Sequence, residues 1–487
     1  MGCGRSVARP SARGTLGPQR KIMLKGQEAV QEVLVREESR PGLPYVWFDT
    51  DIPRLGEPKV DSPIRSIPLF TRNGELVEKS FVSDAERVLV YDSLDYLAQL
   101  KPGEEPLTFE LAGPRAKIFF DPSKVHCAIA TCGGLCPGTN DVIRAIVLEL
   151  HYLYKVRHIY GVRYGFQGFI PRYGHDLVEL TPEVVANIHT FGGTILSSSR
   201  GAQDIHEIVD ALDRLNIHIL FLIGGDGTLR AAAKICEEIA RREMRKSVIV
   251  IPKTIDNDIP LVSRSFGFDT AVEIATDAIR AAHTEALGAP NGIGLVKLMG
   301  RYAGFVAANA ALALREVNFV LIPESDFDLE GEQGLLSCLE RRLVTRNHAV
   351  IVVAEGAGQK FFREEDLPRD PSGNIKPGDI GLLLVEKIKE YFSQRRIEIN
   401  LKYIDPSYII RSMPANYNDR IYCGFLGQNA VHAGMAGKTA MLVSRWHGHY
   451  VHVPIKATVG KSKQVDLDSI LWRSVLESTG QPPLKNV

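Results

Sequence analysis

Between about residue 125 and residue 445, short apolar runs alternate with longer amphipathic stretches, and glycine-rich turns join them. Apolar runs such as 217–223 and 248–251 have the length of buried strands, and intervening stretches such as 228–242 have the periodicity of helices. Strand–helix alternation at this pitch predicts parallel sheets with helices on both faces. In such sheets, ligands bind beyond the carboxyl ends of the strands, which is where the glycine-rich turns lie.

The predicted elements follow one another in a regular order. We expect strands at 126–130, 158–162, 217–223, 248–251, 292–298, 319–322, 349–354 and 439–443. We expect helices at 138–154, 205–215, 228–242, 270–287, 302–314, 380–392 and 418–436. The predicted fold is α/β, with two Rossmann-like, doubly wound parallel-sheet domains and an N-terminal extension.

The composition fits such a fold and excludes several functional classes. A length of 487 residues favours two or three domains, and 45% hydrophobic with 24% charged residues is ordinary for a globular chain. Lysine plus arginine equals aspartate plus glutamate, 58 each, so no bulk charge indicates nucleic acid. No apolar run approaches the ~20 residues that span a bilayer, so we expect no stable membrane insertion.

The cysteines indicate a reducing compartment. Their number, seven, is odd and they are scattered, which predicts free thiols and not a disulfide framework. Cys132 and Cys136 are close together, but no second pair of metal ligands follows, which disfavours zinc. We therefore expect a cytoplasmic protein.

The first 26 residues differ from the rest of the chain. Basic residues precede any acid there, namely Arg5, Arg9, Arg13, Arg20, Lys21 and Lys25. We interpret this segment as a disordered basic tail. An organellar transit peptide, which would direct the protein to a plastid, has the same appearance, and Gly2 with Ser6 and Cys3 also matches an acylation pattern. Residues 27 to about 120 are rich in proline and in charged residues. We expect them to form a partly ordered extension without catalytic chemistry.

The loop at 224–228, Gly-Gly-Asp-Gly-Thr, lies between a predicted strand and a predicted helix. Its glycines let the backbone approach an anion, and Asp226 places a carboxylate beside that anion. Mg²⁺ takes one or two carboxylate oxygens together with substrate phosphates, so the pattern favours phosphoryl transfer. The alternative is a turn in which Asp226 caps the helix. Kinases of NAD and of lipids carry similar loops, so this loop alone does not fix the substrate.

Two further loops follow predicted strands. Residues 131–140, Thr-Cys-Gly-Gly-Leu-Cys-Pro-Gly-Thr-Asn, can cradle a phosphate at a helix N-terminus, although a tight turn has the same sequence character. Residues 252–258, Pro-Lys-Thr-Ile-Asp-Asn-Asp, place Asp256 and Asp258 two residues apart. A kinase that acts on an alcohol needs a carboxylate to accept the hydroxyl proton, whereas solvated loop acids are the alternative.

Three later segments combine cations with a carboxylate. They are 297–301 (Lys-Leu-Met-Gly-Arg), 354–356 (Ala-Glu-Gly) and 402–411 (Lys-Tyr-Ile-Asp-Pro-Ser-Tyr-Ile-Ile-Arg). A sugar phosphate needs cationic forks for its phosphate and a carboxylate for its hydroxyls. Taken singly, each segment is more often a surface ion-pair partner than a ligand site.

The order of these motifs resembles that of the phosphofructokinases. The resemblance covers about residues 125–445 and includes the segment 192–201, Gly-Gly-Thr-Ile-Leu-Ser-Ser-Ser-Arg-Gly. The sequences of the segments 252–260, 296–301 and 402–408 are most similar to those of the plant and trypanosomatid ATP-dependent branch. That branch also has a long N-terminal extension.

The resemblance implies a role for individual residues. Asp256 would be the catalytic base, acting with Thr254 and Arg301, and Asp226 would coordinate Mg²⁺. The ATP site would comprise Gly133, Arg200, Gly201, Gly225, Asp226, Gly227 and Thr228. The fructose 6-phosphate site would comprise Thr254, Asp256, Asp258, Met299, Gly300, Arg301, Glu355, Lys402, Tyr408 and Arg411. The reaction would transfer the γ-phosphoryl group of Mg-ATP to the C1 hydroxyl of fructose 6-phosphate, and the assembly would be a homotetramer.

The resemblance also implies domain boundaries. Residues 1–120 would form the extension. Residues 121–266 with about 412–455 would bind the nucleotide, and residues 267–411 with about 456–487 would bind the sugar phosphate.

Three residues bear on the phosphoryl donor and on the assembly, and two of them, Lys253 and Gly292, depart from the bacterial ATP-dependent pattern. Lys253 stands where those enzymes usually have glycine and is typical of pyrophosphate-dependent relatives. Gly227 is typical of ATP users, whereas pyrophosphate users carry an aspartate that would repel the α-phosphate of ATP, so we expect ATP to be the donor. Gly292 stands where bacterial members have an arginine that reaches a neighbouring subunit, so that contact and bacterial-style allosteric control are not implied. The rivals are a pyrophosphate-dependent enzyme, a kinase of NAD or lipid, and a non-catalytic metabolite-binding subunit.

Overall fold

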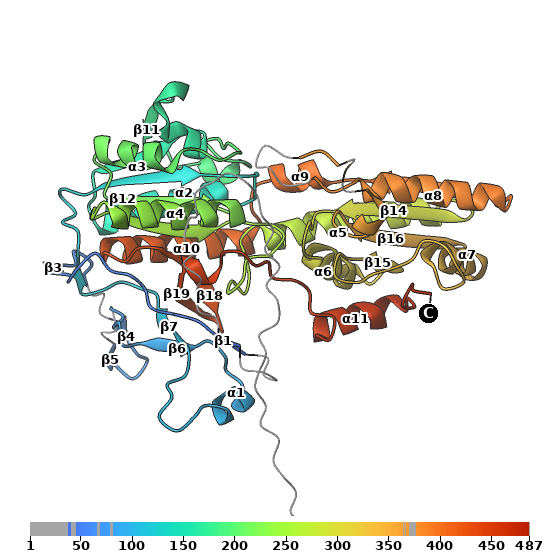
Figure 1. Cartoon of the computed structure of the whole chain (residues 1–487), viewed down its shortest axis with the longest axis horizontal. Coiled ribbons are helices and arrows are strands. Elements are labelled where there is room, and N and C mark those ends of the chain that lie inside the picture. Colours follow the sequence, from blue (N-terminus) through green and yellow to red (C-terminus); the bar gives the residue numbers. More distant parts are fainter. Residues whose placement is uncertain are drawn as a thin grey trace, which may run out of the picture.

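The computed structural model describes residues 38–39, 45–65, 69–77, 81–363, 365, 367–369 and 376–486. The expectations for residues 1–26 lie outside this set. Two β-sheets, each covered by helices, lie side by side along the long axis of the molecule (Figure 1). Within the described part of the chain, no helix combines the length and the apolar character that spanning a bilayer requires.

The first sheet has nine strands in the order β11-β10-β9-β12-β13-β18-β19-β7-β6. Its five central strands are parallel, namely β10 (His158–Val162), β9 (His126–Thr131), β12 (Ile219–Gly224), β13 (Ser247–Pro252) and β18 (Met441–Trp446). Every residue of β12 and β13 is buried, because both faces of the sheet are covered and the strands are continuous apolar runs.

This sheet is mixed, although a purely parallel one was expected. The strands β11 (Leu177–Glu179), β19 (His449–Pro454), β7 (Thr108–Leu111) and β6 (Arg87–Leu89) pair antiparallel with their neighbours. The reversal begins at the two-residue turn His447-Gly448, where both residues have positive φ. Such a turn matches the twist of a hairpin. After the turn the chain runs back as β19, β7 pairs with β19, and β6 pairs with β7.

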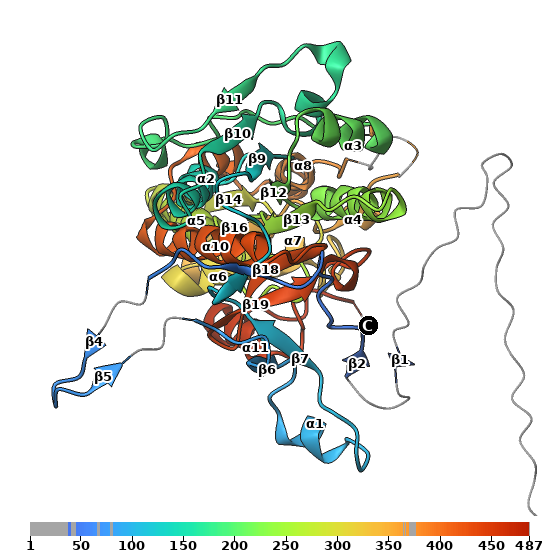
Figure 2. The ribbon, with the colours of Figure 1, turned by 90° about the vertical axis from the view of Figure 1, so that its left-hand side faces the viewer.

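Helices cover both faces of the first sheet (Figure 2). On one face lie α2 (Thr139–Leu148) and α10 (Tyr417–Met435), whose apolar residues share one core. On the other face lie α3 (Ile205–Arg214) and α4 (Asp226–Arg241), which belong to a second core. The expected helix 138–154 ends early as an α-helix, because residues Glu149–Leu153 form the π-helix η1.

The second sheet has four parallel strands in the order β15-β16-β14-β17. They are β14 (Gly292–Leu298), β15 (Phe319–Leu321), β16 (His348–Ala354) and β17 (Asn400–Ile404). One face packs against α5 (Phe268–Leu287) and α6 (Phe305–Leu314), which join the core of α2 and α10. The other packs against α7 (Leu335–Arg346) and α8 (Ile380–Gln394).

The chain crosses between the two sheets three times. The first crossing follows β13 and ends at α5, and the second contains α9 (Ser407–Ser412) and leads into α10. The third, residues 455–469, leaves β19 through η7 (Ile455–Ala457) and reaches α11 (Ile470–Thr479), which packs against α6 and β15. These crossings place loops from both sheets beside one another.

The remaining short elements lie mainly in the N-terminal part. They are β1 (Glu38–Ser39), β2 (Val46–Trp47), β3 (Val60–Asp61), β4 (Leu69–Phe70), β5 (Leu76–Val77), α1 (Leu94–Ala98) and β8 (Lys117–Ile118). The 3₁₀ turns are η2 (Gly165–Phe169), η3 (Pro171–Tyr173), η4 (Ile188–Thr190) and η5 (Gln359–Phe361).

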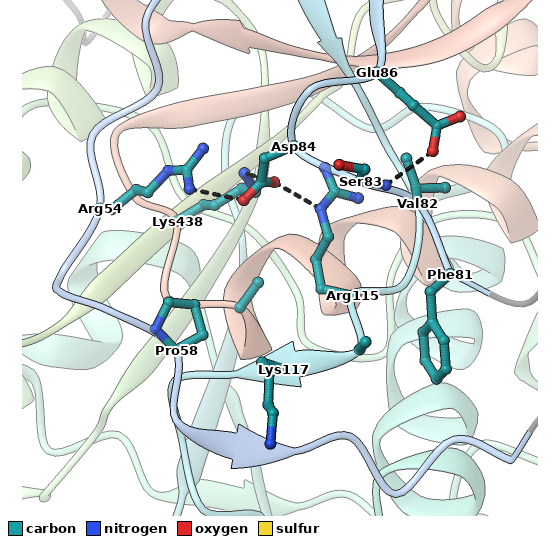
Figure 3. Close-up of a pocket in the computed structure, with 12 residues that line it drawn as sticks. Arg54, Pro58, Phe81, Val82, Ser83, Asp84, Glu86, Arg115, Lys117 and Lys438 are labelled. Carbon is teal, nitrogen blue, oxygen red and sulfur yellow. Dashed lines mark hydrogen bonds and ion pairs between the residues drawn. The ribbon is translucent and has the colours of Figure 1, made fainter.

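A buried ionic junction anchors this N-terminal part to the first sheet (Figure 3). Lys438, at the end of α10, lies 2.5 Å from Glu110 of β7 and 3.0 Å from Asp84. Arg54 bonds to both carboxylates at 2.7 Å, and Arg115 bonds to Asp84 at 2.7 Å. Lys438 is 1% exposed and Glu110 3%, so each is buried with its partner, beside a cavity of about 420 Å³.

Candidate active site

A cleft of about 820 Å³ opens at the carboxyl ends of β9, β12 and β13, and loops of the second sheet form its other wall. This volume is in the range of small-molecule sites. The cleft lies at the sheet edge where parallel α/β sheets bind their ligands. All seven residues predicted for the ATP site line it, namely Gly133, Arg200, Gly201, Gly225, Asp226, Gly227 and Thr228.

The loop after β12 leads directly into α4. Gly225 is the N-cap residue and Asp226 is the first residue of the helix. The Asp226 carboxylate pairs with Arg230 at 2.6 Å, so Asp226 is not the cap residue that the alternative interpretation required. The N-terminus of a sixteen-residue helix therefore borders the cleft, where its N–H groups and dipole favour an anion.

Gly227 leaves space on the cleft side of this helix. A Cβ atom built at Gly227 would meet no other atom within 4 Å, and Gly227 lines the cleft. A Cβ atom at this position would therefore stand in open space at the cleft. The position can thus control what enters the cleft beside the N-terminus of α4.

Lys253 is buried beneath the glycine-rich loop that follows β9. Its Nζ atom donates to the carbonyl oxygen of Gly134 at 2.5 Å, and burial lowers the pKa of the ammonium. Ser198 Oγ donates to the carbonyl oxygen of Gly133 at 2.6 Å. These bonds fix the loop from two sides, and Lys253 itself also lines the cleft.

The loop after β13 holds two carboxylates in a compact turn. Thr254 Oγ1 donates to Asp258 Oδ1 at 2.9 Å and accepts from the backbone N–H of Asp256 at 3.2 Å. Between the carboxylates, Asn257 has a φ of 56°, a left-handed conformation that is uncommon for a residue with a side chain. Thr254, Asp256 and Asp258 all line the cleft.

Asp256 lies in an electrostatic environment suited to a base. Burial raises the pKa of its carboxyl well above the ordinary value, and the nearby Asp258 and Glu355 raise it further. The Arg301 backbone N–H and the charge of Arg411 act in the opposite direction. Its Oδ1 atom is buried without a hydrogen-bond partner among the described residues. Buried polar atoms are rarely left in that state, so this oxygen is available to a ligand.

The opposite wall comes from the second sheet. Met299 and Arg301 follow β14, Arg411 lies in α9, and all three line the cleft. The loops after β14 and β16 are joined, because the backbone N–H of Gly356 donates to the carbonyl oxygen of Gly300 at 3.0 Å. A Cβ at Gly356 would lie 1.9 Å from the Arg301 carbonyl oxygen, so only glycine allows this approach.

Glu355 is a carboxyl whose charge acts on residues of the cleft lining. Burial raises the pKa of its carboxyl, whereas Lys297, Arg301 and Arg411 lower it. Glu355 also contributes to the raised pKa of Asp256. It does not line the cleft itself.

Three other predicted residues also lie outside the cleft lining. Gly300 lies under the joined loops. Lys402 is directed toward α5, where its Nζ lies 3.9 Å from Glu285. Tyr408 is 79% exposed and its ring lies against Arg411. Of the residues predicted in the segment 402–411, Arg411 therefore lines the cleft, whereas Lys402 and Tyr408 do not.

Three residues of the cleft lining, Arg230, Lys234 and Lys461, were not predicted from the sequence, whereas Lys297 belongs to the predicted segment 297–301 and lies outside the lining. Arg230 and Lys234 project from α4 into the cleft lining, and Lys461 reaches it from the third crossing. Lys297 forms ion pairs of 3.0 Å with Asp379 and Asp405, and these pairs raise its pKa. The helical spacing of Asp226, Arg230 and Lys234 was a usable signal for two of them, whereas the crossing has no strand–turn–helix pattern.

The donor set suits a magnesium ion that arrives with phosphates. Among the described residues, no group of three or more His, Cys, Asp or Glu side chains is placed to hold a metal by itself. Asp226 offers a carboxylate at the cleft, and Mg²⁺ typically takes one or two carboxylates plus phosphate and water oxygens. Cys132 and Cys136 are buried free thiols whose pKa is raised by burial, as in an apolar setting.

Residues 126–434 match the phosphofructokinase family, and the chain belongs to it. It is 51% identical over 443 residues to the ATP-dependent 6-phosphofructokinase of Borreliella burgdorferi, covering 89% of this chain and 97% of that protein. It is 47% identical over 377 residues to the ATP-dependent 6-phosphofructokinase of Trypanosoma brucei brucei, covering 77% of each. The resemblance to a branch with trypanosomatid members is confirmed.

Solved structures of the family share the fold. The pyrophosphate-dependent phosphofructokinase of Marinobacter aquaeolei superposes with a TM-score of 0.60 at 19% identity, covering 73% of this chain and 91% of that one. The expected α/β class with two sheets is confirmed, and its first sheet is mixed.

Proposed function

We propose that this chain transfers the γ-phosphoryl group of Mg-ATP to the C1 hydroxyl of fructose 6-phosphate, giving fructose 1,6-bisphosphate and ADP. The observation that carries the proposal is the cleft wall at Asp256, a carboxyl with a raised pKa and an unbonded buried oxygen. It lies between the N-terminus of α4 and the arginines of the second sheet. The relatives named ATP-dependent 6-phosphofructokinase support the same activity.

Asp256 accepts the proton of the C1 hydroxyl in this proposal. The hydroxyl oxygen forms a bond to the γ-phosphorus as the bond to the β,γ-bridging oxygen breaks, and ADP leaves. A raised pKa makes the carboxylate a stronger base. The N–H groups at the start of α4, with Arg301 on the opposite wall, meet the negative charge of the transferring group. When bound beside Asp226, Mg²⁺ neutralises charge on the ATP phosphates.

Each wall of the cleft has its own ligand. The glycine-rich loops at Gly133, Arg200 and Gly227 take the ATP phosphates, whereas Thr254, Asp258 and Arg411 take fructose 6-phosphate. This division supports a nucleotide-binding unit of residues 121–266 with about 412–455. It likewise supports a sugar-phosphate unit of residues 267–411 with about 456–487.

Gly227 supports ATP as the donor. The space beside it admits the α-phosphate, whereas an aspartate there would place a negative charge against it. Lys253 lines the cleft, but its Nζ atom bonds to the Gly134 carbonyl oxygen, so we assign it to the support of that loop. A coupled assay with fructose 6-phosphate and a single donor tests this proposal. Turnover with ATP and none with pyrophosphate is expected, and turnover with pyrophosphate alone would contradict it.

We further propose that the chain assembles as a homotetramer in the cytoplasm. An apolar stripe on α10, formed by Tyr417, Ile421 and Phe425 at helical spacing, is exposed and supports self-association. The buried free thiols support a reducing compartment. Light scattering on the purified protein should give about four times the chain mass of 53.8 kDa, and a monomeric mass would exclude the assembly.

A further inference from the structure

The third crossing between the sheets, residues 455–469, contacts the loop that carries Asp256. Gly460, Lys461 and Ser462 line the cleft, and the next residue, Lys463, is directed inward under that loop. Farther along, the backbone N–H of Val465 donates to Glu324 at 2.7 Å, which ties the crossing to the second sheet. The crossing therefore contacts the loop from one sheet and is anchored to the other.

Lys463 contacts the Asp256 loop through both its backbone and its side chain. Its backbone N–H donates to the carbonyl oxygen of Asp258 at 2.7 Å. Its Nζ atom donates to Asn257 Oδ1 at 3.1 Å, and to the carbonyl oxygens of Val262 at 2.7 Å and Ser263 at 3.3 Å. A single residue thus holds the loop at its middle, at its end and at the turn that follows.

These contacts act on the turn of the loop. Asn257 separates the two carboxylates and has the left-handed φ of 56°, a conformation that asparagine adopts more readily than most residues with a side chain. The Asn257 side chain is held by Lys463 Nζ and by the backbone N–H of Ser265, the latter at 3.1 Å. Removal of the lysine ammonium would leave Asn257 Oδ1 with the Ser265 N–H and without one of these two bonds, next to Asp256.

We propose that Lys463 is a positioning residue, which holds the Asp256–Asp258 loop in its reactive conformation through Asn257. This inference rests on the proposed function, in which Asp256 is the base. The role is reached through the loop, because Lys463 does not itself line the cleft. A displacement of about 1 Å at a reacting group can lower a rate by on the order of 100-fold.

The surroundings of the Lys463 ammonium give the proposal a pH signature. Among the described residues, Asp258 is the charged side chain that acts on it, α6 contributes the Phe305 ring at 5.2 Å, and residues 262–263 contribute carbonyl oxygens. Burial lowers the pKa of Lys463 to about 8, and Asp258 acts in the opposite direction. Turnover that depends on the ammonium therefore falls as pH rises through about 8.

The contribution of Lys463 to the free energy of unfolding depends on pH in the opposite direction to turnover. Because its folded-state pKa lies below the ordinary 10.5, the unfolded chain binds more protons between about pH 8 and 10.5, and stability rises with pH there. A residue that served only the fold would thus not lower turnover in this pH window. The two effects can be measured separately.

The test compares Lys463→Met, which keeps the stem but removes the ammonium, with Lys463→Arg, which stays charged. Lys456→Met, an exposed lysine of the same crossing 4.0 Å from Glu237, is the control. We expect Lys463→Met to lower kcat about 10- to 100-fold, to change KM for both substrates less than about threefold, and to abolish the decline of kcat near pH 8. Lys463→Arg should recover part of kcat and shift the decline to higher pH.

Two results would overturn the inference. One is a kcat of Lys463→Met within twofold of wild type. The other is a loss of thermal stability in Lys463→Met with an unchanged pH profile of kcat, which indicates a structural role. Asp256→Ser is assayed in parallel. If Asp256→Ser is inactive while Lys463→Met is not, the positioning role fails and the base assignment stands. If Asp256→Ser retains activity, the base assignment itself fails.

Discussion

At the scale of single residues, the geometry of one loop sets the pKa of the carboxyls in the cleft. The loop carries Asp256, Asn257 and Asp258. A Thr254 side chain and a left-handed Asn257 fold the loop back on itself, so that two acids share one small space. Burial raises the pKa of both carboxyls, and repulsion adds to it, from Asp258 and Glu355 at Asp256 and from Asp226 at Asp258. The sequence predicted these residue types and their order. It did not predict the lysine beneath Asn257, because contacts from a segment about 200 residues later leave no local pattern.

Gly227→Asp should place a negative charge in the open space beside the N-terminus of α4 and weaken the use of ATP. Its Cβ has no contact within 4 Å, and an aspartate in the first turn of a helix is favourable, so stability should change by less than about 1 kcal/mol. The added charge should lower kcat/KM for ATP at least about 100-fold through repulsion of the phosphates. Steady-state kinetics measures this change, and Gly227→Ala is the uncharged control. Equal losses in both variants would exclude the charge effect.

Elements defined by periodicity were predicted well, and elements defined by tertiary contacts were not. The expected strand 292–298 matches β14 at both ends, and helices α3, α4 and α10 begin and end within two residues of expectation. Neither β17, a half-exposed edge strand in which polar and apolar residues alternate, nor β19, whose hairpin uses His-Gly, was predicted from the sequence, and the helices α7 and α11 also had no predicted counterpart. Packing partners decide such segments more than local propensity does.

The π-helix η1 is an element whose cause is visible in its side chains. Glu149 is buried there, its Oε1 atom lies 3.6 Å from His432 Nε2, and the adjacent Tyr154 hydroxyl bonds to His432 Nδ1 at 2.9 Å. These groups join the η1 segment to His432 of α10, and π-helical turns are frequent at such special sites. The periodic pattern extended the α-helix through this point, because it carries no information about polar pairing.

Glu149→Gln should make stability less dependent on pH. Burial raises the Glu149 pKa from 4.5 to about 7, so the folded protein binds a proton that the unfolded chain releases, and stability falls as pH rises from about 4.5 through 7. Glutamine cannot ionise, so the variant should exceed wild type above pH 7 by on the order of 2 kcal/mol. Urea unfolding at pH 5 and pH 8 measures this. The exposed Glu237→Gln is the control, and equal pH dependence in wild type and Glu149→Gln would contradict the assignment.

At the scale of the whole molecule, the N-terminal part is a structural extension of the first sheet. The strands β6 and β7 pair next to β19, and Lys438, Glu110 and Asp84 join three distant segments. The described residues of this part lie outside the cleft lining. Its antiparallel attachment was not predictable, because short edge strands carry little hydrophobic pattern.

Lys438→Met should destabilise the protein strongly. It removes the cation from a buried pair and leaves Glu110 without that partner, which costs about 3–5 kcal/mol. Lys117→Met is the matched control, because its ion pair with Asp61 is exposed on both sides and should matter by less than about 1 kcal/mol. The urea midpoint of each variant, compared with wild type, measures the difference. Similar midpoints for the two variants would show that the junction does not hold the N-terminal part in place.

The central claim is that both sheets meet to form one catalytic cleft in which Asp256 is the base. The most direct measurement is kcat of Asp256→Ser with Mg-ATP and fructose 6-phosphate, together with the binding of both ligands by calorimetry. A base supplies a large share of the rate and little of the binding, so we expect kcat to fall by several orders of magnitude while both dissociation constants stay within about tenfold. A kcat near that of the wild type would contradict the account.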